Sequence, residues 1–231
     1  MTARYALYLA PAEDSALWRA GCAWLGRDPR TEASSVQPKI EGISVDRLRT
    51  LTASPRHYGL HATLKPPMRL ADGVSADLLI DAVRTLAAAT RAFMLPALVV
   101  DTLSGFIALR TVHSSAALQQ LADDCVAQLD RFRRASDAVE LAQRRSAGLS
   151  ARQEALLTRF GYPYVMDEWR FHITLTERVA GAERDLLLAR LTAHFADALA
   201  QPLRCEDLCL FVQDRAAQPF VLRERFALAD R

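Results

Sequence analysis

Apolar and polar side chains alternate in several short stretches of the chain, a pattern typical of strands that bury one face. The opening stretch, ARYALYLA, and two later stretches that contain histidine show the alternation best. Turn-forming residues such as Gly105 separate the later stretches. We predict strands at residues 3–10, 59–65, 93–101, 105–110, 169–176, 202–213 and 219–228.

Apolar residues at helical spacing fill most of the remaining chain and predict helices. Ser44 precedes one of these runs and is suited to cap it, and Gly161 follows another and is suited to end it. The segment 114–160 is helical in character, with a break near Gly148 and Ser150. We predict helices at residues 14–25, 44–51, 75–91, 118–135, 151–160 and 181–199.

The order of these elements predicts an α+β fold in which antiparallel strand pairs pack under helices. A histidine-containing strand, a helix and two further strands occur in this order twice. The chain is therefore expected to be one domain, 1–231, with pseudo-repeat halves at 1–113 and 160–231 joined by the helical segment 114–160.

The composition narrows the class of protein. The chain has 231 residues, is 51% hydrophobic, and carries 29 Lys and Arg against 27 Asp and Glu, for a net charge of +2. This composition excludes a wholly disordered chain, and the near-neutral charge disfavours a dedicated duplex-binding protein. Lys39 and Lys65 are the only lysines, so arginine supplies nearly all the positive charge.

The sequence gives no sign of export or of a membrane partner. No window reaches the roughly 20 uninterrupted apolar residues that a membrane span needs. The N-terminus lacks a small-residue cleavage pattern, so we do not expect a signal peptide. Four cysteines in a chain of this length do not form a disulfide framework, so a reducing, cytoplasmic location is expected.

Two near-identical motifs carry the candidate chemistry: HATL at 61–64 and HITL at 172–175. The period of a strand puts the histidine and the threonine of each motif on one face, about 6.5–7 Å apart. One neutral imidazole can accept a proton from an attacking water, and the other, protonated, can give one to a leaving oxygen. The threonine hydroxyls can donate hydrogen bonds to a phosphate held between them.

A single H-x-T strand is weak evidence, because a half-exposed histidine beside a threonine is common on protein surfaces. Two copies in matching places of a repeated pattern favour a catalytic pair. The other histidines, His57, His113 and His194, lack this context and are interpreted as structural or surface residues. No HxH, HExxH or carboxylate-rich cluster is present, so no metal and no cofactor is expected.

The paired motifs resemble the signature of the 2H phosphoesterase superfamily. The strings RHYGLHATLKPP, GYPYVMDEWRFHITLT and RYALYLAP resemble more narrowly the branch encoded in bacterial phosphonate-utilisation operons. The resemblance implies a bilobal α+β fold, with two antiparallel sheets flanked by helices around a central cleft. It also implies an acid–base pair, His61 and His172, and two phosphate-binding hydroxyls, Thr63 and Thr174.

The activity that the resemblance implies is metal-independent opening or forming of cyclic phosphodiesters, typically 2′,3′-cyclic phosphates of nucleotides or RNA ends. Cleavage of carbon–phosphorus bonds in such operons passes through a ribose cyclic phosphate. A small cyclic ribose phosphate is therefore a candidate substrate by association, and an RNA end is another.

Three further residues near the motifs are candidates for substrate binding. Lys65 and Arg170 share the strand face of a motif residue and could contact a second phosphate; alternatively, they are solvated charges at strand ends. Tyr58 could stack on a base or sugar, although aromatic residues near strand ends more often serve packing. Pro66 and Pro67 end the pairing of this strand or place it at an edge.

Two alternative functions remain open at this stage. The chain could be a non-catalytic nucleotide or RNA-end binding protein that keeps the cleft, or it could run the same reaction towards ligation. The exact substrate, the roles of the two histidines and the oligomeric state are not determined by the sequence.

Overall fold

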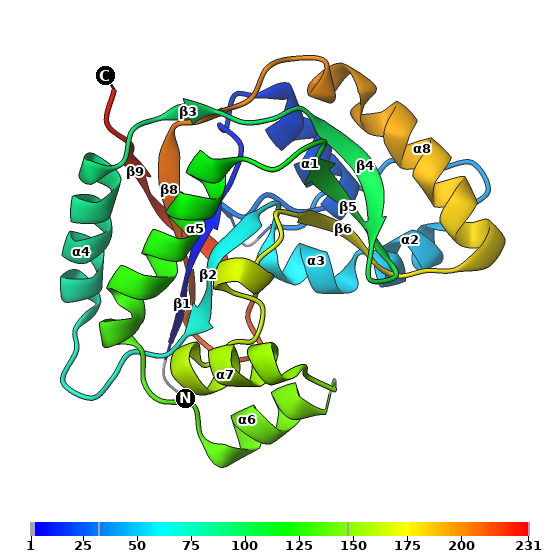
Figure 1. The fold of residues 1–231 in the computed structure, drawn as a ribbon. Coiled ribbons are helices and arrows are strands. Elements are labelled where there is room, and N and C mark those ends of the chain that lie inside the picture. The colour runs from blue at the N-terminus through cyan, green and yellow to red at the C-terminus, as the bar shows by residue number, and fades with distance from the viewer. Residues whose placement is uncertain (1–2, 32, 147, 231) are drawn as a thin grey trace.

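A computed structural model describes residues 3–31, 33–146 and 148–230, and Figure 1 shows a broad sheet flanked by helices. The strands are β1 (Arg4–Leu9), β2 (Ala62–Met68), β3 (Phe93–Met94), β4 (Leu98–Leu103), β5 (Phe106–Thr111), β6 (Ile173–Arg178), β7 (Arg204–Cys205), β8 (Asp207–Gln213) and β9 (Val221–Ala227). The helices are α1 (Ala16–Leu25), α2 (Val45–Leu51), α3 (Ala53–Tyr58), α4 (Ala76–Ala89), α5 (Ala116–Leu129), α6 (Ala138–Arg145), α7 (Ala151–Phe160) and α8 (Gly181–Leu199).

The seven longer strands form one sheet in the order β4-β5-β6-β2-β1-β8-β9, and β3 pairs with β7 in a separate two-stranded sheet. Every strand pair is antiparallel. Helix α5 packs on β2, α4 packs on β9, and α8 packs on β4. The predicted α+β class, with antiparallel sheets flanked by helices, is confirmed.

The spatial lobes of the sheet combine strands from distant parts of the chain. Strand β1 pairs with β2 on one side and with β8 of the C-terminal hairpin β8–β9 on the other, whereas β6 pairs with the hairpin β4–β5 that precedes it by more than 60 residues. Each lobe of the sheet therefore contains one motif strand together with the hairpin that belongs to the other pseudo-repeat half. Within the described residues, the two lobes of the sheet pair with each other only between β2 and β6.

Several predicted boundaries differ from the structure. The predicted strand 93–101 divides into β3 and β4 around Pro96, because a proline cannot donate a hydrogen bond to a ladder. The predicted strand 169–176 becomes regular only at Ile173, after the 3₁₀ turn Met166–Glu168. The predicted caps hold: the Ser44 side chain accepts from the Arg47 amide, and Gly161 ends α7 with a φ of 70°.

Two irregularities in β2 change which way its side chains face. Tyr8 pairs with Thr63 but Leu7 pairs with Lys65, so Leu64 is an extra residue in β2 at this point. A bulge of this kind interrupts the alternation of side chains across a strand. Strand β2 also continues through Pro66 and Pro67 to Met68, past a second shift in register, so the two prolines do not end the pairing with β1.

A buried tryptophan joins α1 to the second motif strand. The side chain of Trp24 is fully buried, and its indole N–H donates to the carbonyl oxygen of Leu175 at 2.8 Å. This carbonyl belongs to β6, one residue beyond Thr174. Burial makes this hydrogen bond costly to lose, because water cannot replace the donor.

Replacing Trp24 with Phe is expected to lower the free energy of unfolding by about 1–3 kcal/mol, since the Leu175 carbonyl would lose its donor while buried. Urea denaturation measures the change. Val36→Ala is the control, because Val36 is 94% exposed and its truncation should stay within about 0.5 kcal/mol of the parent protein. A Trp24→Phe protein as stable as the parent would contradict the assignment of this bond.

Candidate active site

The two motifs meet through a single register pair in the middle of the sheet. Ala62 of β2 lies opposite Ile173 of β6, and both side chains are buried in the main core. In an antiparallel pair the flanking residues are then opposite one another as well: His61 faces Thr174, and Thr63 faces His172. By strand geometry the two histidines are diagonal neighbours, about 7–8 Å apart between backbones.

Two cavities, each of about 340 Å³, open over this four-residue array. One is lined by His61, Thr63 and Thr174, and the other by Thr63 and His172. Thr63, Pro66 and Tyr162 line both cavities, so they are contiguous. The structure therefore brings together all four residues that the two motifs predict.

Backbone contacts fix the orientation of the His61 ring. Its Nδ1 lies 2.9 Å from the carbonyl oxygen of Gly59, and because a carbonyl only accepts, Nδ1 carries the proton. Nε2 is then the acceptor for the Thr63 hydroxyl at 3.2 Å. Gly59 has a φ of 83°, and an added Cβ would lie 2.7 Å from Pro29, so glycine is needed at this position. The Tyr8 ring stacks on His61 with centroids 3.8 Å apart.

His172 is held in the same way. Its Nδ1 donates to the carbonyl oxygen of Arg170 at 2.8 Å, two residues earlier, as His61 donates to Gly59. The Phe106 ring lies 5.6 Å from the imidazole. Both histidines thus have the tautomer that leaves Nε2 available for proton transfer.

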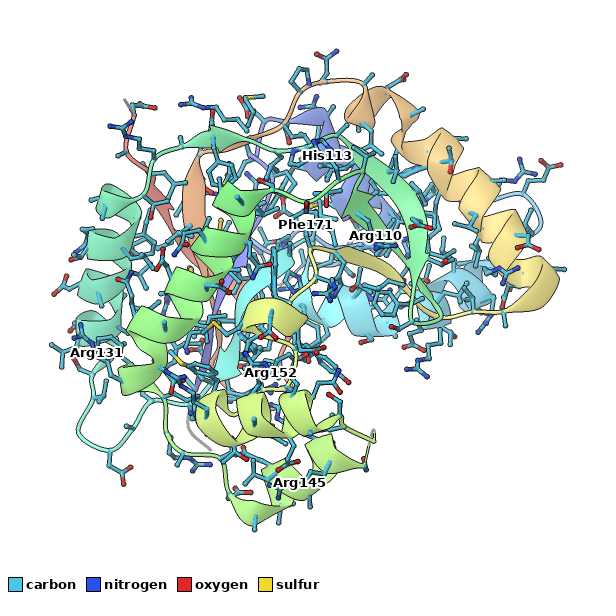
Figure 2. The ribbon with its side chains drawn as sticks, in the orientation of Figure 1. Arg110, His113, Arg131, Arg145, Arg152 and Phe171 are labelled. Carbon is cyan, nitrogen blue, oxygen red and sulfur yellow. The ribbon has the colours of Figure 1, made fainter. Side chains whose placement is uncertain are left out.

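Burial lowers the pKa of both imidazoles. The pKa of His61 falls from 6.5 to about 4, mainly through burial; the bond to Gly59 opposes this shift and the charge of His172 adds to it. Burial also lowers the pKa of His172, against its bond to the Arg170 carbonyl and with help from the charge of Arg110, which Figure 2 labels. Without a ligand both rings are therefore neutral at pH 7, and an anion between them would favour protonation.

A second tryptophan braces the first motif. The indole N–H of Trp169 donates to the backbone carbonyl of Thr63 at 2.8 Å, which ties the segment before β6 to β2. Trp169 also lines the His172 cavity.

Two of the three other predicted binding residues line the cavities. Tyr58 lines the His61 cavity with its ring 5.9 Å from the imidazole, and it also stacks on Phe220 at 5.2 Å. Arg170 lines the His172 cavity, while its Nη1 donates to the carbonyls of Asp167 and Trp169. Their contacts with a substrate stay predictions.

The prediction for Lys65 is wrong in its geometry. The bulge at Leu64 turns Lys65 to the face of Leu7, away from His61 and Thr63. Lys65 lies under α5, where its Nζ is 3.3 Å from the Asp130 carboxylate and donates to the Val126 carbonyl at 3.3 Å. The prediction assumed that side chains alternate strictly between the two faces of the strand, and an inserted residue interrupts that alternation.

The sequence did not single out three residues that line the His61 cavity: Arg4, Tyr8 and Arg144. Tyr8 had a signal, because Tyr5 and Tyr8 fall on opposite faces of the first strand and only one could face the cleft. Arg4 and Arg144 had none, since they come from β1 and α6 and no spacing relates them to the motifs.

No group of three or more His, Cys, Asp or Glu side chains is placed to hold a metal ion within residues 3–31, 33–146 and 148–230. All four cysteines are buried and unpaired. Among the described helices, none is long and apolar enough to cross a membrane.

The low pKa of the buried His61 ring is expected to make the folded protein less stable in acid. The folded imidazole takes a proton only near pH 4 and the unfolded one near pH 6.5, so the unfolded state binds more protons between these values. As the pH falls through this window, the parent protein should lose up to about 3 kcal/mol of unfolding free energy relative to His61→Gln. Denaturant titrations of both proteins at several pH values measure this loss. A difference in unfolding free energy that stays constant with pH would contradict the buried, neutral ring.

Lys65 is expected to show a pH dependence of the same sign as His61, in an alkaline window. Burial lowers the pKa of its ammonium group from 10.5 to about 8, against the attraction of Asp130. Between these values the unfolded state again holds the extra proton, so stability rises as the pH rises from 8 to 10.5. The parent protein should gain up to about 3 kcal/mol relative to Lys65→Met across this range. No gain would mean that Lys65 is solvated.

Comparison with known proteins gives a family and several relatives. Residues 63–221 match a family described as a protein of unknown function, DUF1045. The chain is 41% identical over 226 residues to a protein of Janthinobacterium sp. (strain Marseille) named ribose 1,5-bisphosphate phosphokinase PhnN. It is 40% identical over 220 residues to a protein of the same name from Laribacter hongkongensis.

These matches cover 96% and 95% of this chain but only 50% of each relative, so the chain spans about half the length of the curated relatives it matches. Among solved structures, a phosphoesterase is 16% identical with a TM-score of 0.45 over 99% of both chains. E. coli LigT complexed with 3′-AMP is 16% identical with a TM-score of 0.43, again over 99% of both chains. The family match extends over more than half of the sequence, and the chain belongs to the DUF1045 family.

Proposed function

We propose that this chain is a metal-independent cyclic phosphodiesterase that hydrolyses a small cyclic ribose phosphate. The observation that carries the proposal is the Ala62–Ile173 register, which sets two H-x-T motifs side by side over contiguous cavities. The two histidines have matching tautomers and the two threonines bring hydroxyl donors, as acid–base opening of a cyclic phosphate requires.

In the proposed reaction, one neutral imidazole takes a proton from water through Nε2 while the water oxygen attacks phosphorus. The bond from phosphorus to one ribose oxygen breaks, and the other imidazole, protonated, gives its proton to that oxygen. The product is a ribose phosphate monoester, and the proton gained by the first histidine replaces the one lost by the second. The hydroxyls of Thr63 and Thr174 donate hydrogen bonds to the non-bridging oxygens.

The surroundings support a base that is ready at neutral pH. A buried imidazole with a low pKa is unprotonated and can accept a proton, and the negative phosphate favours protonation of its partner. The Thr63 hydroxyl now donates to Nε2 of His61, so a bound phosphate would have to take over this hydroxyl and leave Nε2 to the water.

Ribose is the sugar that we propose, since the named relatives, of twice the length, are described as acting on ribose 1,5-bisphosphate. A small cyclic ribose phosphate also fits the link to phosphonate metabolism that the motif strings suggest. We do not propose the kinase activity for this chain: neither lysine follows a glycine, so the G-x-x-x-x-G-K-[S/T] phosphate loop is absent from its sequence. The buried thiols fit a reducing, cytoplasmic compartment.

His61→Ala and His172→Ala are each expected to lower kcat about 10²- to 10⁴-fold, because each removes one proton-transfer group. The assay uses 2′,3′-cyclic nucleotides and ribose cyclic phosphates in the presence of EDTA. His113→Ala is the matched control, since His113 is exposed and lines neither cavity. Thr63→Val, which keeps the shape of the side chain, should lower kcat by a smaller factor.

Unchanged turnover in both histidine variants would refute the mechanism, and loss of activity with EDTA would refute metal independence. Saturable binding of the cyclic phosphates with no turnover by the parent protein would instead favour a non-catalytic nucleotide or RNA-end binding protein.

A further inference from the structure

A third cavity, of about 460 Å³, adjoins the His61 cavity and is strongly basic. Arg4, Pro66, Pro67, Arg144 and Tyr162 line both cavities, so one space leads into the other. The basic side chains of its wall are Arg4, Lys65, Arg69, Arg133, Arg134 and Arg144, and its one acidic side chain is Glu140.

Four of these six cations form ion pairs with carboxylates. Arg69 and Arg134 form ion pairs with Glu140. Lys65 and Arg133 form ion pairs with Asp130, which lies beside the cavity. These four cations therefore each have a carboxylate partner.

Arg4 and Arg144 differ from the other four. Neither has a carboxylate within ion-pair distance in the part of the chain that the structure describes. Arg4 donates through Nε to the Gln213 side chain at 2.6 Å and lies over the Phe220 ring at 5.2 Å. These contacts hold its guanidinium in place, and its Nη groups have no acceptor among the residues that the structure describes.

Arg144 is held by an aromatic ring alone. It lies over Tyr162 at 4.8 Å, and its buried Nε has no hydrogen-bond partner within the described structure. In the adjoining His61 cavity, the fully buried hydroxyl of Tyr8 also has no hydrogen-bond partner among the described residues. Buried polar groups in native proteins are nearly always paired, so these groups indicate a bound polar molecule.

We propose that Arg4 and Arg144 bind a second phosphate of the substrate. The substrate class is then a sugar cyclic phosphodiester that also carries a separate phosphate monoester. That this phosphate belongs to a substrate rests on the proposed function. The anion site itself does not depend on that function. Two uncompensated guanidiniums match a phosphate dianion in charge, and their planar N–H groups match its oxygens in geometry.

The span between the two sites limits the size of the sugar. Thr63, at the reacting phosphate, and Pro66, which lines both cavities, are three residues apart on β2, at most about 10 Å along a strand that the bulge at Leu64 shortens. One sugar unit with phosphates at its two ends fits within this distance.

A titration with inorganic phosphate tests the site without any turnover. Histidine ring signals and arginine Nε–Hε signals are followed by NMR in the parent protein, in Arg144→Gln and in Arg131→Gln. Arg131 is the matched control: it also lies 4.8 Å from an aromatic ring, that of Phe132, but it is exposed and lines none of these cavities (Figure 2).

We expect two separable sets of shifts, one at His61 and His172 and one at Arg4 and Arg144, with only the second set lost in Arg144→Gln. Shifts at the histidines alone would overturn the second site and leave the proposed function standing. Shifts at the arginines alone would support the second site and would count against phosphate binding between the two histidines, on which the proposed function depends. Equal weakening in Arg131→Gln would show that the arginines act only through net charge, which also overturns the site.

Kinetics then test the substrate class, with 2′,3′-cyclic AMP compared with the same compound carrying a 5′-phosphate. The parent protein should have a kcat/KM about 10- to 100-fold higher for the doubly phosphorylated compound, because charged hydrogen bonds to phosphate are strong. Arg144→Gln should remove this preference, Arg144→Lys should restore part of it, and Arg131→Gln should leave it unchanged. A parent protein with equal kcat/KM for both compounds would overturn the substrate class.

Discussion

The structure depends on one backbone contact, the pairing of Ala62 with Ile173 between β2 and β6. This is the only register pair that joins the two lobes of the seven-stranded sheet within the described residues. Because both side chains face the core, their neighbours on each strand must face the other way. The same contact therefore joins the two lobes of the sheet and sets His61, Thr63, His172 and Thr174 around contiguous cavities.

Tryptophans reinforce this junction from both sides. Trp24 donates to a carbonyl of β6 and Trp169 donates to a carbonyl of β2, each at 2.8 Å. A motif strand that shifted by one residue would lose this bond and would also turn its apolar residue out of the core. The same packing therefore stabilises the fold and positions the candidate acid–base groups.

Burial of the two imidazoles and the nearby arginines determine the protonation state and the charge of the site. Both imidazoles are neutral in the ligand-free protein, and Arg110, Arg4 and Arg144 lie near or along the cavities. The near-neutral net charge hides this arrangement, since 27 acidic residues balance most of the 29 basic ones. A basic cleft in a protein of low net charge suits a small anion better than an extended polyanion.

The sequence by itself determined the α+β class, most helices with their caps, and the two H-x-T motifs, because these depend on local spacing that one strand or helix imposes. The tertiary structure decided the rest. A bulge at Leu64 turned Lys65 into the interior, and no local pattern reveals an inserted residue. Arg4 and Arg144 come from segments 140 positions apart in the chain, and only the tertiary fold brings the start of β1 and α6 to one cavity.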